Sequence, residues 1–230
     1  MNVRKFSPDV DQNIRDLIGA MFNDQTEPKK YCDAMRELGK LLGKLIADRL
    51  PSDTSKHACV ACTVEDADYL AQGFIESLES ARPNLTVSFA CFWNQPSIDP
   101  YEMEEFDVSR VIKSYKEPTD KDCFLIVLKS VISGGCVVAT NIMNLITTLE
   151  PERIFVVAPM MMSNSPKRLR EHFGTRLVRR FEYVTFATDT ERQPGMSVYQ
   201  HYGWHDADEK NESVPNLVET RRRRFASTGT

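Results

Sequence analysis

The sequence lacks any hydrophobic run long enough to cross a membrane, because no stretch approaches the ~18 consecutive apolar residues that a spanning helix needs. The first ten residues also lack the apolar segment of a secretory signal, so we expect a cytoplasmic protein with no membrane partner. No strong excess of one charge exists either, since 29 basic side chains stand against 33 acidic ones, a net charge of −4. This balance argues against a protein that binds nucleic acid through its overall charge.

Patterns that identify a covalent catalyst or a zinc site are also missing. The four histidines show no arrangement typical of an activated nucleophile, and no GxSxG sequence occurs. Cys59 and Cys62 have CxxC spacing, but they lie in a strand-like run where an offset of three places them on opposite faces. Because no second Cys or His pair accompanies them, we expect no metal site there and predict that most of the six cysteines are reduced core thiols.

The composition that is present fits a globular protein with its own core. Hydrophobic residues make up 41% of the 230 residues and charged residues 27%. A chain of this length buries roughly 70% of the surface that its unfolded form exposes, which excludes a scaffold that depends on disulfides. We expect one compact unit with three parts: a helical N-terminal segment over residues 1–50, an α/β core over 51–198 and a C-terminal element over 199–230.

The hydrophobic pattern predicts two helices followed by alternating strands and helices. Apolar residues recur at helical spacing over 9–22 and 31–50. Apolar runs predict strands at 56–63, 85–93, 123–131, 153–162 and 183–189. The helices between them are predicted at 65–80, from 136 to about 149 and at 166–180, and the polar segment 94–122 is expected to be a loop. Continuous apolar strands separated by helices indicate a mainly parallel sheet covered on both faces, so the predicted fold is a three-layer α/β/α sandwich.

The segment 123–138 carries the clearest chemical signal. A buried strand runs into Ser133, Gly134, Gly135 and Cys136, and a helix follows. Glycines let a backbone approach a ligand closely, and a helix N-terminus offers free N–H groups with a partial positive charge. Because this turn would lie beyond the C-terminal end of a strand, these four residues are predicted to bind a phosphate. A tight connection without a ligand is the alternative interpretation.

This segment resembles the phosphoribosyl pyrophosphate loop of type I phosphoribosyltransferases. In that family four apolar residues, two acidic ones and two small or apolar ones precede Thr-Gly-Gly-Thr; here Phe124 to Val127 match the strand and Ser133 to Cys136 the phosphate-binding end. The resemblance in the order of elements covers residues 30–217. It implies a phosphoribosyltransferase-like fold, a ligand that contains ribose 5-phosphate, a Mg²⁺ ion and a C-terminal hood over the base. The hood residues would be Tyr202, Trp204 and Asp206.

The acidic pair of that family is missing here. Leu128 and Lys129 occupy its positions, or Lys129 and Ser130 if the register shifts by one residue. An apolar residue and a lysine cannot accept hydrogen bonds from ribose hydroxyls or bind a hard cation. The turn 63–68 is acidic where a pyrophosphate site favours glycine or basic groups. Two interpretations remain open. Asp66 and Asp68 replace the lost pair as catalytic residues that hold a metal or ribose hydroxyls, or they stabilise the start of the following helix.

Acidic and basic residues gather in separate stretches. Residues 99–107 hold five acidic side chains and no basic one, 167–180 hold six basic side chains against one Glu, and four arginines follow at 221–224. Such runs are most often solvated faces, but they also suit an acidic partner or a polyanion. The predicted contacts with nucleic acid or a partner protein are Lys167, Arg168, Arg170, Arg221, Arg222, Arg223 and Arg224.

Functions from different classes follow from these observations. The first is a phosphate- or nucleotide-binding effector subunit, built on a phosphoribosyltransferase-like scaffold with a degenerate active site and held in a larger complex near nucleic acid. This resembles the phosphoribosyltransferase-like accessory proteins of bacterial anti-phage systems, including retrons. The alternative is an active enzyme that transfers or hydrolyses the ribosyl phosphate of a nucleotide or of phosphoribosyl pyrophosphate. A third alternative is a ligand-free structural subunit of a homo-oligomer.

Overall fold

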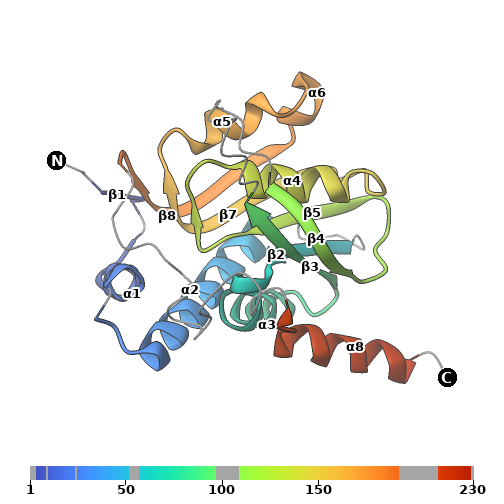
Figure 1. Cartoon of the computed structure of the whole chain (residues 1–230), viewed down its shortest axis with the longest axis horizontal. Coiled ribbons are helices and arrows are strands. Elements are labelled where there is room, and N and C mark those ends of the chain that lie inside the picture. Colours follow the sequence, from blue (N-terminus) through green and yellow to red (C-terminus); the bar gives the residue numbers. More distant parts are fainter. Residues whose placement is uncertain are drawn as a thin grey trace.

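A computed structural model gives the fold and describes residues 4–8, 10–23, 25–51, 57–96, 109–191 and 212–228. Within these residues the strands form one eight-stranded sheet with helices on both faces (Figure 1). This arrangement confirms the predicted α/β fold with a mainly parallel sheet and N-terminal helices. None of the described helices is both long and apolar enough to cross a membrane.

The sheet is parallel except at its two edges. Its strands are β1 (Lys5–Phe6), β2 (His57–Thr63), β3 (Thr86–Pro96), β4 (Ser109–Lys116), β5 (Cys123–Leu128), β6 (Val131–Ile132), β7 (Arg153–Met162) and β8 (Phe181–Asp189). Their order is β1-β8-β7-β5-β2-β3-β4, and β6 pairs with the end of β7. The inner strands run parallel to one another, in the order β8, β7, β5, β2 and β3. The edge strands β1 and β4 run antiparallel to the strands beside them.

The helices divide between the two faces of the sheet. They are α1 (Gln12–Phe22), α2 (Pro28–Arg49), α3 (Gln72–Ala81), α4 (Cys136–Leu145), α5 (Ser165–Glu171), α6 (Thr175–Val178) and α8 (Asn216–Thr228). A 3₁₀ turn, η1 (Val64–Asp66), and a π-helical turn, η2 (Ala67–Ala71), precede α3. Helices α1, α2, α3 and α8 cover one face, and α4, α5 and α6 cover the other (Figure 1).

Each face of the sheet has its own hydrophobic core, because side chains alternate along every strand. In β2, Val60 and Cys62 belong to the core under α2 and α3, while Cys59 and Ala61 belong to the core under α4. Cys59 and Cys62 therefore lie on opposite faces, as predicted, and both are free thiols. Burial raises the pKa of the Cys59 thiol to about 11, which keeps it protonated at neutral pH.

The segment 94–122 differs most from its predicted structure. β3 continues to Pro96, and Ser109–Lys116 return as β4, the outer strand of the sheet. Residues 97–108, with the acidic run, lie outside the described part of the chain. β4 has a polar sequence because most of its side chains are exposed at the sheet edge, so it lacks the apolar run by which the buried strands were predicted.

Two predicted helices are interrupted. The helix expected over 166–180 is divided into α5 and α6 at Gly174, whose extended backbone (φ −66°, ψ 153°) cannot continue a helix. The helix expected over 65–80 begins as the 3₁₀ turn η1, which is wound more tightly than an α-helix, and the π-helical turn η2, which is wider. It becomes α-helical only at Gln72. Irregular turns of this kind are frequent next to functional sites.

Helices α2 and α3 approach each other at three glycines. A Cβ on Gly39 would overlap the carbonyl oxygen of Leu70, and a Cβ on Gly73 would overlap that of Arg36. Gly43 lies in the same way against the backbone of α3. Because only glycine lacks a Cβ, these residues fix how closely the two helices can pack.

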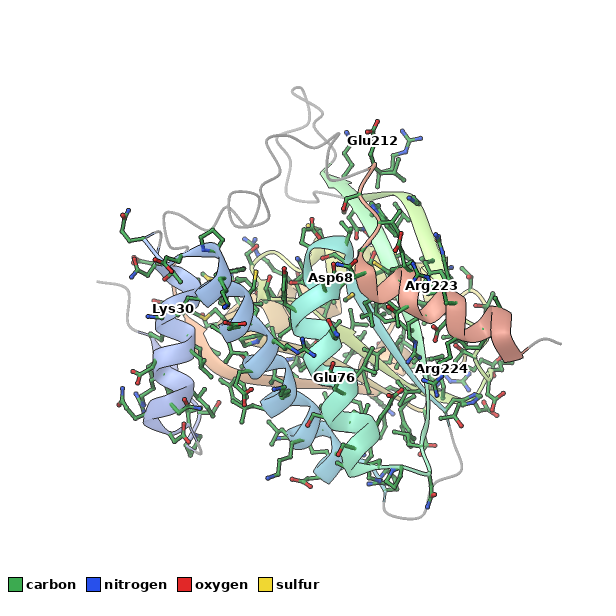
Figure 2. The ribbon with its side chains drawn as sticks, turned by 90° about the horizontal axis from the view of Figure 1, so that it is seen from below. Lys30, Asp68, Glu76, Glu212, Arg223 and Arg224 are labelled. Atoms are coloured by element: carbon green, nitrogen blue, oxygen red, sulfur yellow. The ribbon has the colours of Figure 1, made fainter. Side chains whose placement is uncertain are left out.

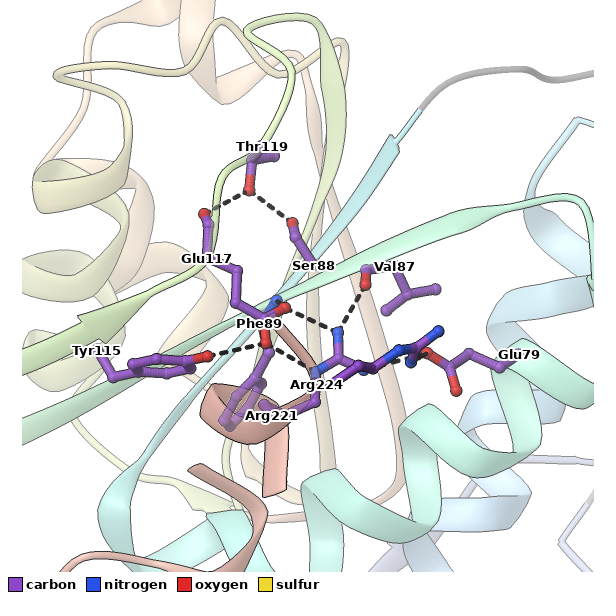
Figure 3. A network of polar contacts seen from close by, with 9 residues as sticks. All are labelled: Glu79, Val87, Ser88, Phe89, Tyr115, Glu117, Thr119, Arg221 and Arg224. Atoms are coloured by element: carbon purple, nitrogen blue, oxygen red, sulfur yellow. Dashed lines mark hydrogen bonds and ion pairs between the residues drawn. The ribbon is translucent and has the colours of Figure 1, made fainter. Parts of the chain in front are cut away.

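The C-terminal helix α8 is attached to the sheet by a buried polar network (Figure 3). The Glu117 carboxylate accepts hydrogen bonds from Nε and Nη2 of Arg221, each at 2.8 Å. It also accepts the hydroxyl of Tyr115 at 3.1 Å and the backbone N–H of Phe89 at 2.7 Å. Arg221 further donates to the carbonyl oxygen of Val87 at 2.6 Å. The side chain of Glu117 is fully buried and that of Arg221 is 6% exposed, so the pair belongs to the protein interior.

Candidate functional site

The two turns predicted to carry chemistry lie together where the order of the strands reverses. From β2 the chain goes outward to β3 on one side, and later returns to place β5 on the other side of β2. Because β2 and β5 are parallel, the turn after β2 and the turn after β5 leave the same edge of the sheet. In open α/β sheets, the crevice between such strand ends is where ligands bind.

The glycine turn before α4 is shaped by Gly135 and held by Ser165. Gly135 has φ of +89°, a left-handed conformation that favours glycine. The Ser165 hydroxyl, at the start of α5, lies 2.9 Å from the carbonyl oxygen of Ile132 and 2.6 Å from that of Ser133. Because a trans peptide places its N–H opposite its C=O, the N–H groups of Ser133 and Gly134 point away from Ser165.

Polar groups at this turn lack partners within the residues that the structure describes. There, the backbone N–H groups of Ser133 and Gly134 donate to no acceptor. The hydroxyl oxygen of Ser130 is buried and forms no hydrogen bond with any described residue, and the whole residue is only 2% exposed. Buried polar groups are nearly always hydrogen-bonded, so the Ser130 hydroxyl suits a ligand with several acceptor oxygens, and the N–H groups of the partly exposed Ser133 and Gly134 offer further donors to it. The N-terminus of α4 adds a partial positive charge.

A buried ion pair joins the two turns. Lys129 follows β5 and places Nζ 2.7 Å from Oδ2 of Asp66 and 3.0 Å from the Thr63 hydroxyl. Oδ1 of Asp66 accepts the backbone N–H of Ser130 at 3.1 Å, and Oε2 of Glu65 lies 3.9 Å from Nζ. The Asp66 side chain is 1% exposed and that of Lys129 16%. The acidic turn is therefore partly neutralised by a residue that stands where the phosphoribosyltransferase family has an acidic pair.

These charges leave no place for a divalent cation at Asp66. Burial lowers the pKa of the Lys129 ammonium, but the Asp66 and Glu65 carboxylates outweigh burial, so its pKa is raised and it is charged at neutral pH. Both oxygens of Asp66 already accept hydrogen bonds, one of them from this ammonium. No group of three or more metal-ligating side chains occurs in the described part of the chain. The Mg²⁺ ion that the family resemblance implies does not fit these residues.

Asp68 takes part in a different contact from Asp66. Its carboxylate accepts the backbone N–H groups of Leu217 at 2.8 Å and Asn216 at 3.1 Å, at the start of α8 (Figure 2). A carboxylate in this position satisfies free helical N–H groups and interacts favourably with the helix dipole. The structure thus separates the two predicted catalytic carboxylates. Asp66 pairs with a lysine, and Asp68 does stabilise a helix, although that helix is α8 and not α3.

The predicted basic contacts divide between α5, beside the glycine turn, and α8, on the other face of the sheet (Figure 1). The exposed residues among them are Lys167, Arg168 and Arg170 on α5, and Arg222, Arg223 and Arg224 on α8. Arg221 differs because its guanidinium is buried against Glu117, which removes it from the exposed contact surface. The two groups of cations therefore do not form one continuous surface.

Some predicted residues lie outside the described part of the chain, and some residues of the site were not predicted. Tyr202, Trp204 and Asp206 are outside the described ranges. Ser165 contributes to the site without having been predicted, and Ser130 was considered only as a residue that could stand at the position of the acidic pair. Ser165 follows a long apolar strand and precedes a proline, which is a signal for a helix start at a strand end. Ser130 carries no comparable signal, because its importance depends on the packing around its hydroxyl.

Comparisons with known proteins show the fold only. No family model matches the chain, and no curated protein matches its sequence. The AQ2163 protein from Aquifex aeolicus matches with a TM-score of 0.63 and 14% identity, over 90% of this chain and 97% of that one. A hypoxanthine phosphoribosyltransferase from Staphylococcus aureus matches with a TM-score of 0.41 and 11% identity, over 65% of this chain and 72% of that one.

The hypoxanthine-guanine phosphoribosyl transferase of L. donovani matches with a TM-score of 0.45 and 10% identity, over 66% of this chain and 77% of that one. The chain thus shares its fold with the Aquifex protein, at low sequence identity. One fold supports many activities, so the function has to be argued from the residues of the site.

Proposed function

We propose that this protein binds the phosphate of a ligand that contains ribose 5-phosphate, such as a nucleotide, and acts as a binding or effector subunit. The observation that carries the proposal is the buried hydroxyl of Ser130, which has no partner in the described residues and lies in the same connection as the free N–H groups of Ser133 and Gly134. A phosphate offers oxygens that accept from all of these donors. The left-handed backbone at Gly135 lets this connection turn directly into α4.

The contacts of Asp66 and Asp68 support binding over group transfer. Transfer at the ribose requires groups that stabilise an oxocarbenium-like centre and its hydroxyls. Both carboxylate oxygens of Asp66 accept hydrogen bonds, from Lys129, Thr63 and Ser130. Both oxygens of Asp68 accept hydrogen bonds from the backbone of α8. An enzyme that transfers or hydrolyses a ribosyl phosphate would need other residues for these tasks.

Binding is tested by thermal shift and calorimetry with ribose 5-phosphate and nucleotides. The wild-type protein is expected to be stabilised by ribose 5-phosphate, and Gly135→Asp is expected to weaken binding by at least about tenfold. The variant strains a backbone with φ of +89° and directs its side chain against Leu169 of α5, so it is expected to distort the glycine turn. The melting temperature of the unliganded variant shows whether the fold itself has changed.

Gly174→Asp is the matched control for this variant. Gly174 also precedes a helix, but its φ is −66° and no atom of the described residues lies within 4 Å of the position that a Cβ would take. We expect Gly174→Asp to bind like the wild type. Absence of any stabilisation by ribose 5-phosphate or nucleotides would contradict the proposal, and release of free base or pyrophosphate during the assay would replace it with an enzymatic function.

The effector part of the proposal concerns a polyanionic partner that contacts α8. The side chains of Arg223 and Arg224, labelled in Figure 2, are 82% and 68% exposed. The carboxylates of Glu219 and Glu79 lie 3.5 Å and 3.8 Å from them, respectively. Exposed ion pairs of this kind are weak, so the guanidinium groups can exchange them for phosphates. Membership in a larger complex would follow from such a contact.

We expect nucleic acid to copurify with the protein from its native host, and a triple variant to lose most of it. The variant is Arg222→Gln with Arg223→Gln and Arg224→Gln, which leaves the buried Arg221 in place. The same charge change on α2, with Gln at the exposed positions Lys29, Lys30 and Lys44, is the control. Nuclease treatment before purification identifies the bound material. Equal loss from both variants, or none from the wild type, would refute a contact through α8.

A further inference from the structure

We infer that Lys129 supplies, from within the protein, the positive charge that a divalent cation supplies in metal-dependent phosphate sites, so that the ligand binds without a metal. The inference rests on the proposed function. The site would then be an anion site that needs no metal, and Lys129 would be the residue that makes it so. It starts from the disagreement between the Mg²⁺ ion that the resemblance implies and the side chains that are present.

Within the described ranges, the contacts of Lys129 leave one of its N–H donors for a ligand. An ammonium group has three N–H donors. Two of them face the Asp66 carboxylate at 2.7 Å and the Thr63 hydroxyl at 3.0 Å. The nearest oxygen of Glu65 lies 3.9 Å away, beyond hydrogen-bond distance. With 16% of its side chain exposed, Lys129 is buried enough to be fixed in place and open enough to reach a bound anion.

The local charges indicate why this arrangement excludes a metal. A Mg²⁺ ion needs oxygen ligands at close to octahedral geometry and keeps several waters. At this place it would have to share the Asp66 carboxylate with an ammonium that is already in contact with it. Repulsion between the two cations opposes that sharing, whereas a phosphate near the same ammonium is attracted.

The neighbouring residues extend the same chemistry. Ser130 follows Lys129 directly, its backbone N–H is fixed on Asp66 at 3.1 Å, and its buried hydroxyl has no partner in the described residues. This anchoring leads the chain from the ion pair into the short strand β6 and then into the glycine turn. A ligand at this edge of the sheet would therefore meet donors from a lysine, a serine hydroxyl and free N–H groups, next to the Asp66 and Glu65 carboxylates that Lys129 partly neutralises.

The inference is tested first on the wild-type protein. The dissociation constant of ribose 5-phosphate is measured by calorimetry in EDTA and again in excess Mg²⁺. We expect the two values to agree within about twofold, because the site's own cation is covalently part of the chain. Binding that is tenfold tighter in Mg²⁺ would overturn the inference while leaving the proposed function intact. No binding in either buffer would instead remove the proposed function.

Two variants test the role of Lys129 itself. Lys129→Met is expected to weaken binding in EDTA by at least about tenfold, and Lys121→Met, an exposed lysine paired with Glu150, is the control with unchanged binding. Because Lys129→Met leaves the Asp66 carboxylate buried without its partner, Asp66→Asn provides an independent measurement. That variant frees Lys129 from its counter-charge, so we expect ribose 5-phosphate to bind as tightly as in the wild type, or more tightly, in EDTA. Loss of binding in Asp66→Asn, with retained binding in Lys129→Met, would refute the inference.

Discussion

Replacing Arg221 by methionine is expected to lower the free energy of unfolding by about 3–5 kcal/mol, the usual result of removing one partner from a buried ion pair. The reason is the position of Glu117, whose side chain is completely buried and accepts two hydrogen bonds from Arg221. Without the guanidinium, Tyr115 and the N–H of Phe89 remain as donors to that carboxylate, but no other cation among the described residues pairs with its charge. The midpoint and slope of urea denaturation measure the loss.

Arg223→Met is the matched control on the same helix. The Arg223 side chain is 82% exposed, and its ion pair with Glu219 spans 3.5 Å between consecutive turns. Exposed pairs of this kind contribute less than about 0.5 kcal/mol, so the two arginines should differ severalfold in effect. Adding Glu117→Gln to Arg221→Met should restore part of the stability, because it removes the uncompensated charge. Similar denaturation midpoints for Arg221→Met and Arg223→Met would show that the network does not hold α8.

A single methyl group at Gly39 is expected to cost about 3 kcal/mol, at the upper end of the range for overpacked interiors. The added Cβ would overlap the carbonyl oxygen of Leu70 in η2, and neither backbone can move aside without separating α2 from α3. Leu38 and Leu42, which flank this contact on α2, are completely buried and would lose packing as the helices separate. Thermal or urea denaturation of Gly39→Ala measures the cost.

Gly19→Ala is expected to change the free energy of unfolding in the opposite direction from Gly39→Ala. Gly19 lies inside α1, and in the part of the chain that the structure describes nothing is within 4 Å of the position that its Cβ would take. There the substitution only improves helix propensity, so it should stabilise the protein by about 0.5–1 kcal/mol. A Gly39→Ala variant that is as stable as Gly19→Ala would mean that α2 and α3 are not in the close contact described.

The elements that could be predicted from the sequence are those whose residues carry their own signal. β2, β5 and β7 are buried on both faces, and their continuous apolar runs were enough to place them within about three residues. β4 and α8 were not predicted as regular elements. β4 lies at an exposed edge, and α8 has a sequence rich in arginine. Its helical structure depends on partners remote in sequence, among them Asp68 and Glu117.

The candidate site divides in the same way. The glycine turn could be identified because its signal, a strand followed by Ser-Gly-Gly and a helix, is contained in one short segment. The pairing of Lys129 with Asp66 joins residues 63 positions apart, so the sequence could show only that a lysine stands where an acidic residue was expected. Asp66 and Asp68 were predicted to act together because they are only two residues apart. Their actual partners, Lys129 and the start of α8, are remote in sequence and could not be predicted.

The two hydrogen-bond contacts of the Ser165 hydroxyl have a consequence for the rate and cost of ligand capture. They hold the carbonyl groups of Ile132 and Ser133 in place before any ligand arrives. A turn that is already ordered gives up little conformational freedom on binding, so little of the interaction energy is consumed in arranging it. Association at such a turn is governed by diffusion and by the charges around the crevice, not by a slow rearrangement of the backbone.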